Sequence, residues 1–271
     1  GKSARALEIA QRRNGVVINA DATQLYADLR ILSARPTAEE MQGIEHRLYG
    51  VMQGDEPATA ASWMALAATE IKRAWTADKL PILCGGTGLY LKALQEGLSA
   101  IPAVPVEIRD SIQHLPNEAI FAKLQEVDAP IVAKLKAGDT QRLRRAYEVF
   151  LASGKPLSYW QVQPKQPLFP QAAFVLETLN PPRKELYARC DARFVQMLKQ
   201  GAIEEVKLLL AKGYPLTAPI MKAVGVPEIS AYLRGEISLE EATAQAQQAT
   251  RNYAKRQVTW LRNQLHPTNL S

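Results

Sequence analysis

Apolar residues at the start of the chain follow first a helical and then a strand-like spacing. From Ala4 to Arg13 they recur at helical intervals, which predicts an amphipathic helix that Gly15 ends at a turn. Residues 16–18 are a short apolar run, typical of a buried strand, and Asp21 follows at its carboxyl end. This order of helix, strand and acid is typical of a phosphate-binding α/β domain.

The same alternation continues through the first hundred residues. A helical period over Ala61–Trp75 precedes the apolar run Leu80–Cys84, which predicts a buried strand, and a glycine turn leads into a helix over Leu89–Glu96. Alternating helices and strands predict a parallel sheet. We therefore expect residues 1–104 to form the first part of a P-loop NTPase-like core, a parallel sheet flanked by helices.

Prolines mark the boundaries of the next block. One proline-rich stretch, 101–105, breaks the alternation, and a second, 163–170, follows a region whose pattern is helical throughout. Within it, one helix is expected to be capped at Asp139 and to end at Gly154. We expect residues 105–168 to form an all-helical insertion domain.

The chain after this block returns to an apolar run and then to helical patterns. Residues 172–179 predict a further core strand, and long helices are expected to follow it. Because the helical block lies between two segments of α/β type, it is interpreted as an insertion. Residues 169–271 are then the second, mostly helical part of the core.

Composition excludes several classes of protein. The chain has 271 residues, of which 47% are hydrophobic and 22% charged, as in ordinary globular proteins. No apolar run reaches the length of a membrane span, and no signal peptide is visible. Cys84 and Cys190 are too few and too far apart for a disulfide scaffold, which fits a reducing compartment. A cytoplasmic monomer without a membrane partner is expected.

Charge is unevenly distributed along the chain. The formal net charge is +6, and the 30 residues after Glu241 contain no acid. This distribution indicates either a polyanionic partner or a solvated basic helix, and charge alone does not separate the two. The cations of this acid-free stretch are Arg251, Lys255, Arg256 and Arg262.

A helical wheel separates the basic and aromatic residues of this stretch. Arg251, Lys255 and Arg262 fall on one face, and Tyr253 and Trp260 fall on the other. The aromatic side chains are interpreted as core anchors that present the basic face to solvent, where it can meet a nucleic-acid backbone. A second basic site is expected in the helical insertion, at Arg142, Arg144 and Arg145.

Gly1, Lys2 and Ser3 match the last three positions of the phosphate-binding loop G-x-x-x-x-G-K-[ST]. In that loop the lysine neutralises terminal phosphates and the hydroxyl ligates Mg²⁺. Lys2 and Ser3 are therefore candidates for binding a diphosphate and, for Ser3, a metal ion. The alternative is a plain helix start capped by Ser3. The strand and glycines that precede such a motif are not in the sequence, so we expect it to be truncated there.

Asp21 is the candidate for acid–base chemistry. Ligands of open α/β sheets lie at the carboxyl ends of the strands, where a carboxylate can hold Mg²⁺ through water or act as a general base. The alternative is a helix N-cap, with Gln24 completing a capping box. The two roles are compatible.

Two further features suit a phosphorylated ligand. Gly85, Gly86 and Thr87 resemble an anion-binding turn, because glycines let backbone N–H groups approach a phosphate and the hydroxyl can donate to it. Arg183 follows two prolines after the last predicted strand. It is a candidate for a bidentate clamp on a leaving phosphate, and equally for a surface arginine near a helix start.

Five motifs occur in order along the chain: DATQLY at 21–26, SARPT at 33–37, GGTGLYLKAL at 85–94, DTQR at 139–142 and YAKRQVTW at 253–260. Together they closely resemble the bacterial tRNA dimethylallyltransferase family, also called tRNA isopentenyltransferases, over essentially the whole chain. The resemblance implies Mg²⁺-assisted transfer of a dimethylallyl group from its diphosphate. The acceptor is the exocyclic amine of the adenosine 3′-adjacent to the anticodon in tRNA.

The resemblance also implies roles for single residues. Asp21 takes the proton of the amine, Thr87 donates to the oxygen between the allyl carbon and the diphosphate, and Arg183 clamps the diphosphate. The implied diphosphate-binding set is Gly1, Lys2, Ser3, Gly85 and Gly86. Gln24 contacts the target base, and the implied tRNA-binding set is Thr23, Gln24, Ser33, Arg35, Gln141, Arg142, Arg145, Arg251, Lys255 and Arg256.

The chain departs from the family pattern at two positions, and two other classes of function stay open. Ala22 stands where the family has serine, which removes a hydroxyl, and Ser33 stands where it has threonine. A small-molecule or nucleotide kinase shares the phosphate loop but needs ATP. A non-catalytic RNA-binding protein accounts for the basic faces but not for the chemistry at Asp21, Thr87 and Arg183.

Overall fold

The structure, a computed structural model, describes residues 1–264 and divides into two compact units. The first unit contains Gly1–Gln95 and the chain from Gln171 onward. The second is Glu96–Pro170, whereas the proline pattern predicts 105–168. The boundary lies earlier because the chain leaves the first unit where helix α4 (Gly88–Glu96) ends.

Three parallel strands form the sheet of the first unit, in the order β2-β1-β3. β1 (Gly15–Asn19) lies between β2 (His46–Arg47) and β3 (Leu80–Cys84), with Asn19 paired to Cys84. Every residue of β1 is buried, as expected for the central strand of a sheet covered on both faces. The carboxyl ends of β1 and β3 are therefore neighbours, and the loops that follow them start side by side.

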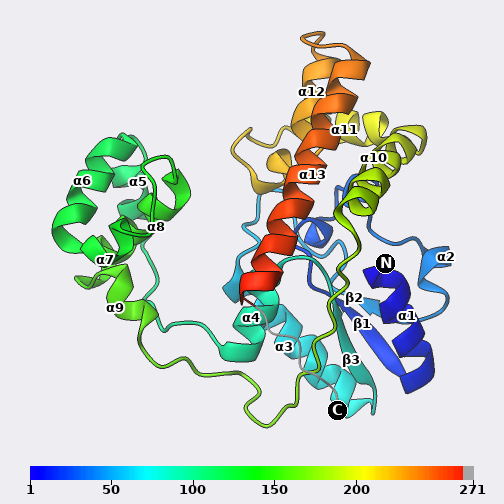
Figure 1. The fold of residues 1–271 in the computed structure, drawn as a ribbon, viewed down its shortest axis with the longest axis horizontal. Helices are drawn as coiled ribbons and strands as arrows, with labels where there is room; N and C mark the ends of the chain where they lie inside the picture. The colour runs from blue at the N-terminus through cyan, green and yellow to red at the C-terminus, as the bar shows by residue number, and fades with distance from the viewer. Residues whose placement is uncertain (265–271) are drawn as a thin grey trace. The chain divides into compact units, whose positions relative to one another are not determined.

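Helices cover both faces of this sheet (Figure 1). α1 (Lys2–Arg13) packs on one face, where buried Ala10 meets Val17 of the central strand. On α3 (Ala60–Thr76), the fully buried Trp63 donates from Nε1 to the carbonyl oxygen of Asn19 at 2.7 Å. This bond satisfies a backbone acceptor at the end of β1, directly before the loop that carries the candidate chemistry.

The end of α1 differs from the prediction. Asn14, with φ 48° and ψ 53°, forms the left-handed C-cap, and Gly15 is already the first residue of β1. A Cβ on Gly15 would lie 2.5 Å from Cδ1 of Ile82 and 2.9 Å from Cα of Ala10. The glycine is thus required by the close approach of the helix to the sheet and not by the turn.

Two strand predictions need correction. Leu80 in β3 is 37% exposed and only Cys84 of that strand is buried, because β3 is an edge strand of the described sheet. Residues 172–179 form no strand: half-buried and exposed positions alternate along an extended segment, and Glu177 pairs with Arg5 of α1 at 2.8 Å. Its alternating burial reflects one covered face of a segment that is not a strand.

The rest of the first unit is helical. α13 packs against α10 and α12, as Figure 1 shows. Residues 265–271 of the predicted range lie outside the described residues. The bounds are Arg183–Lys199 for α10, Ala202–Ala211 for α11, Val226–Leu233 for α12, Leu239–Gln264 for α13, Ala38–Met41 for α2, and Thr23–Leu25 and Pro219–Lys222 for the 3₁₀ helices η1 and η2.

The second unit consists of short helices around an apolar core of its own. The core residues are Ile120, Leu124, Ile131, Leu143 and Ala146. No helix formed by residues 1–264 is both long enough and apolar enough to span a bilayer. The bounds are Val106–Ile112 for α5, Asn117–Val127 for α6, Ala129–Val132 for α7, Thr140–Ser153 for α8 and Leu157–Gln161 for α9.

Helix α8 carries the basic residues predicted for this unit. It ends at Gly154, which has φ 65° as a left-handed C-cap requires. Asp139 is the N-cap residue, but its side chain makes no capping hydrogen bond. Arg144 donates to the carbonyls of Ile112 and Leu115 at the end of α5, so it holds two helices together. The prediction that Arg144 belongs to a basic surface is therefore wrong.

Candidate active site

Asp21 lies two residues beyond the end of β1, where the backbone fixes its side chain. Its Oδ1 accepts the N–H of Thr23 at 3.0 Å. Its own N–H donates at 2.8 Å to Oδ1 of Asn19, a fully buried residue whose amide also donates to the carbonyl of Leu48. The carboxylate is consequently held in one orientation at the end of the central strand.

Burial raises the pKa of the Asp21 carboxyl above its usual range. Hydrogen bonds from the amides of Thr23 and Gln24 and the charge of Lys2 offset only part of this rise. A carboxylate with a raised pKa is a stronger base than an exposed one, and shifted pKa values of this kind cluster at functional sites.

This pKa shift predicts that Asp21 lowers the stability of the fold. When the pKa of a group is higher in the folded state than in the unfolded state, its contribution to stability is fully present at a pH below the unfolded-state pKa. That contribution is lost as the pH rises through the folded-state pKa. Asp21→Asn should therefore raise the free energy of unfolding at neutral pH, and the gain should vanish at acidic pH. Urea unfolding across this range measures it, with Asp55→Asn, at an exposed carboxylate, as control. Equal responses of the two variants would contradict the prediction.

The turn after β3 is bonded to the loop after β1. Thr87 accepts the N–H of Ala22 on Oγ1 at 3.0 Å, and its own N–H donates to the carbonyl of Ala20 at 3.1 Å. A Cβ on Gly85 would lie 2.1 Å from the carbonyl carbon and oxygen of Ala20. The glycine permits this approach, and the approach sets Thr87 beside Asp21.

Helix α13 packs over the same turn. Gln257 donates from Nε2 to the carbonyl of Gly86 at 2.9 Å. A Cβ on Gly88 would lie 2.2 Å from the Trp260 ring. The glycines of this turn therefore have a steric explanation that is independent of any anion.

Tyr253 is a candidate site residue that the sequence pattern does not single out. The helical wheel predicts a core anchor, and the side chain is half-buried on α13. Burial and the charge of Asp21 raise the pKa of the Tyr253 hydroxyl, while hydrogen bonds with Gln257 and Thr87 lower it by less. The hydroxyl thus lies among the candidate residues. Its spacing of four from Gln257, which puts both on one helix face, was the available signal.

Lys2 and Ser3 lie in the exposed first turn of α1, whose N-cap is Gly1. Burial raises the pKa of the Cys84 thiol, against smaller opposing effects from the Lys2 charge and a hydrogen bond with Ser3. Since Lys2 also acts on Asp21, the start of α1 faces the ends of β1 and β3. Ser3 lies within the helix and does not cap it.

Arg183 is placed differently from the prediction. It is the first residue of α10 and follows no strand, because residues 172–179 form none. Its Nε donates to the Tyr187 hydroxyl at 2.9 Å, and its guanidinium lies 5.2 Å from the centroid of that ring. Both contacts are within its own helix, so they do not tie Arg183 to Asp21 or Thr87.

The candidate base-contacting residues hold their own loop together. Gln24 donates from Nε2 to the carbonyls of Ser33 and Ala34 at 2.9 and 3.0 Å, so it does not complete the capping box that was the alternative role for Asp21. The Ser33 hydroxyl donates to a backbone carbonyl at 2.7 Å, and the Arg35 guanidinium donates to two others at 3.2 and 3.3 Å. Thr23 is half-buried beside them.

The basic residues of α13 have different surroundings. Lys255 and Arg256 are exposed, and the Arg256 guanidinium lies 5.8 Å from the centroid of the Tyr253 ring. Arg251 is half-buried and pairs with Asp191 of α10 at 2.6 Å. The prediction that Arg251 shares an open basic face is therefore wrong, because its guanidinium forms an ion pair between α13 and α10.

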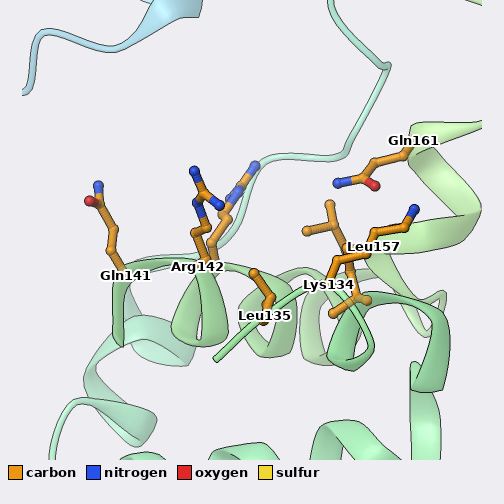
Figure 2. Close-up of a pocket in the computed structure, with 8 residues that line it drawn as sticks. Lys134, Leu135, Gln141, Arg142, Leu157 and Gln161 are labelled. Atoms are coloured by element: carbon orange, nitrogen blue, oxygen red, sulfur yellow. The ribbon is translucent and has the colours of Figure 1, made fainter. Parts of the chain in front are cut away.

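In the second unit, the predicted tRNA-binding residues of α8 lie around one cavity of about 510 Å³ (Figure 2). Cationic and amide side chains stand over apolar ones, and Figure 2 shows Gln141 and Arg142 projecting from the same helix. Such a surface can take an aromatic base on its apolar part and a phosphate on its cations. The lining is Ile131, Lys134, Leu135, Gln141, Arg142, Arg145, Leu157 and Gln161.

The site lies at the strand ends of a parallel sheet and combines a carboxylate of raised pKa, a hydroxyl and a lysine. This layout is typical of an enzyme that binds a phosphorylated substrate. Comparison with known families makes the class specific. The model of the IPP transferase family matches residues 24–264, and the chain belongs to this family.

Individual relatives agree with this assignment. A tRNA dimethylallyltransferase of Rhodospirillum centenum is 50% identical over 269 residues, which cover 98% of this chain and 86% of the relative. The crystal structure of the tRNA isopentenylpyrophosphate transferase of Bacillus halodurans is 31% identical, with a TM-score of 0.69, covering 98% of this chain and 84% of that one. A eukaryotic dimethylallyltransferase acting on tRNA is 26% identical, with a TM-score of 0.79 and coverages of 96% and 67%.

Proposed function

We propose that this protein transfers a dimethylallyl group from dimethylallyl diphosphate to the exocyclic amine of the adenosine 3′-adjacent to the anticodon in tRNA. Family membership and the names of the relatives support prenyl transfer to tRNA. The observation that carries the proposal is the fixed Asp21 carboxylate at the end of β1, with the Thr87 hydroxyl and the Lys2 charge beside it. We interpret the first unit as a P-loop NTPase-like core and the second as its insertion domain.

Asp21 acts as the general base in this proposal. The amine nitrogen forms a bond to the allyl carbon while the bond from that carbon to the diphosphate oxygen breaks. The electron pair leaves with the diphosphate, and the amine proton passes to Asp21. Burial favours this step because it raises the pKa of Asp21 and so brings it closer to the pKa of the amine that loses the proton. The adenosine must leave its stack to reach a carboxylate at the base of the site.

The departing diphosphate needs positive charge and hydrogen-bond donors. Lys2 and the free N–H groups in the first turn of α1 supply both, since helix N-termini favour anions. Thr87 is the donor proposed for the bridging oxygen, with its Oγ1 held by the N–H of Ala22. Arg183 would complete the clamp by leaving the ring of Tyr187, and this role stays a prediction.

Mg²⁺ fits the donors present. Ser3 offers a hard oxygen atom at the start of α1, and the described residues contain no cluster of three or more His, Cys, Asp or Glu side chains that could hold a metal alone. Mg²⁺ suits such a sparse set, since it is usually held by one or two protein oxygens together with substrate phosphates. When bound, the ion would neutralise charge on the diphosphate.

Transfer of label tests this function directly. We would incubate the full-length protein with radiolabelled dimethylallyl diphosphate, Mg²⁺ and unmodified tRNA, and follow label into the RNA. Transfer that is lost when the one adenosine is replaced by another base is the expected result. Absence of transfer together with ATP turnover would contradict the proposal and favour a P-loop kinase.

Salt dependence tests the proposed RNA contacts. Arg142→Ala and Lys255→Ala should each weaken tRNA binding and reduce the slope of log K against log salt by about 1, as for one lost phosphate contact. Equilibrium binding at several salt concentrations measures this. Lys123→Ala, at an exposed lysine of the same unit as Arg142, is the control. An unchanged slope would remove the residue concerned from the interface.

A further inference from the structure

The carboxylate of Glu205 on α11 binds three consecutive backbone amides of another segment. Oε1 accepts the N–H groups of Arg30 and Ile31 at 2.7 and 2.8 Å, and Oε2 accepts that of Leu32 at 2.9 Å. The three amides belong to a turn, where neither a helix nor a strand supplies acceptors. Hydrogen bonds to an ionised carboxylate are roughly twice as strong as neutral ones, so this contact is the main anchor of the turn.

The anchored turn carries the acceptors that hold Gln24. Ser33 and Ala34 directly follow the three amides, and their carbonyls bind the Gln24 side chain. Gln24 in turn lies three residues after Asp21. A displacement of the turn would therefore move Gln24, while Lys2 and the turn after β3 belong to other segments.

A second attachment holds the same segment from the chain after α11. The Tyr214 hydroxyl donates to Oδ2 of Asp28 at 2.9 Å, and Lys212 pairs with the other carboxylate oxygen. Side chains far along the sequence thus bind this part of the chain both at the amides of residues 30–32 and at Asp28. Only the first of the two contacts acts on the turn that binds Gln24.

We infer that Glu205 is a positioning residue that holds the turn 30–34, and through it Gln24, in the conformation that receives the tRNA. The inference rests on the proposed function, in which Gln24 contacts the target base. It assigns to Glu205 an effect on the RNA substrate and none on the diphosphate substrate, because Thr87 bonds Ala22 and Gly86 bonds Gln257, both outside the turn 30–34.

The test is steady-state kinetics of Glu205→Ala with each substrate varied in turn. We expect the KM for tRNA to rise about tenfold, a fraction of the loss that a 1 Å misplacement can cause, and the KM for dimethylallyl diphosphate to stay unchanged. Glu205→Gln, which keeps one carbonyl oxygen, should give a smaller rise and serves if the alanine variant does not fold. Glu204→Ala removes the adjacent exposed carboxylate, paired only along the helix with Lys207, and should match wild type.

Amide hydrogen exchange gives a readout independent of activity. In Glu205→Ala the amides of Arg30, Ile31 and Leu32 should exchange faster than in wild type, and in Glu204→Ala they should not. The inference would be overturned if the wild type is active and Glu205→Ala raises both KM values equally. It would also be overturned if exchange at these amides is unchanged in Glu205→Ala. A wild type that transfers no label would instead refute the proposed function, and the exchange rates would still report on the anchor.

Discussion

Replacing Asp21 by alanine is expected to lower kcat for prenyl transfer by about 10²- to 10⁴-fold, the range that general base catalysis contributes. The Kd for tRNA should remain close to that of wild type. The reason is that Asp21 is a single half-buried carboxylate at a strand end, whereas the cations proposed to bind the RNA phosphates, such as Arg142 and Lys255, are exposed and lie elsewhere. Removing it deletes the proton acceptor and leaves those cations in place.

Single-turnover kinetics and equilibrium tRNA binding on the same protein separate the two effects. Asp21→Asn is the matched variant, because its Oδ1 can still accept the N–H of Thr23 while the amide cannot take a proton. Both variants should be slow if proton transfer is the lost function. Turnover near the wild-type rate in Asp21→Ala would exclude the general-base role.

Gly85→Ala is expected to disrupt both fold and activity. The added Cβ would lie 2.1 Å from backbone atoms of Ala20, and neither segment can yield, because the N–H of Thr87 bonds the same Ala20 carbonyl. Overpacking of this kind lowers the free energy of unfolding by about 1–3 kcal/mol, and rigid backbone atoms place this case at the upper end. Any folded fraction should turn over slowly because Thr87 is displaced from Asp21.

Denaturant unfolding monitored by circular dichroism measures the loss. Gly138→Ala is the control, since a Cβ there has no atom within 4 Å and the backbone needs no left-handed conformation. It should leave the free energy of unfolding within about 0.5 kcal/mol of wild type, as surface substitutions do. Equal midpoints for the two variants would contradict the steric explanation of Gly85.

The sequence predicts the carboxyl end of the central strand, where the candidate site lies, because local signals suffice there. The apolar run before Asn19 and Asp21 predicts a buried strand with a polar end without information from distant segments. The observed strand β1 agrees with this prediction. The glycine turn is also found, but for an incomplete reason. Gly85 and Gly86 suggest a phosphate cradle, whereas the structure adds steric contacts with Ala20 and Gln257.

The wrong predictions concern residues whose structure depends on contacts with segments far along the chain. The alternation over 172–179 indicates one covered face, but a ladder needs a neighbouring strand, which no local pattern reports. A helical wheel places Arg251 on a face but cannot name Asp191 as its partner. Tyr253 has an apolar ring and a polar hydroxyl, and periodicity registers only the ring.

The contact of α13 with the glycine turn has a consequence for protein synthesis. Asp21 and Thr87 are translated early, whereas Tyr253, Gln257 and Trp260 leave the ribosome only after nearly all of the described chain. Folding during synthesis proceeds from the N-terminus, so the glycine turn after β3 stays exposed until α13 has been synthesised. A ribosome-bound nascent chain that lacks α13 is therefore expected to be inactive, as is any product of premature termination before this helix.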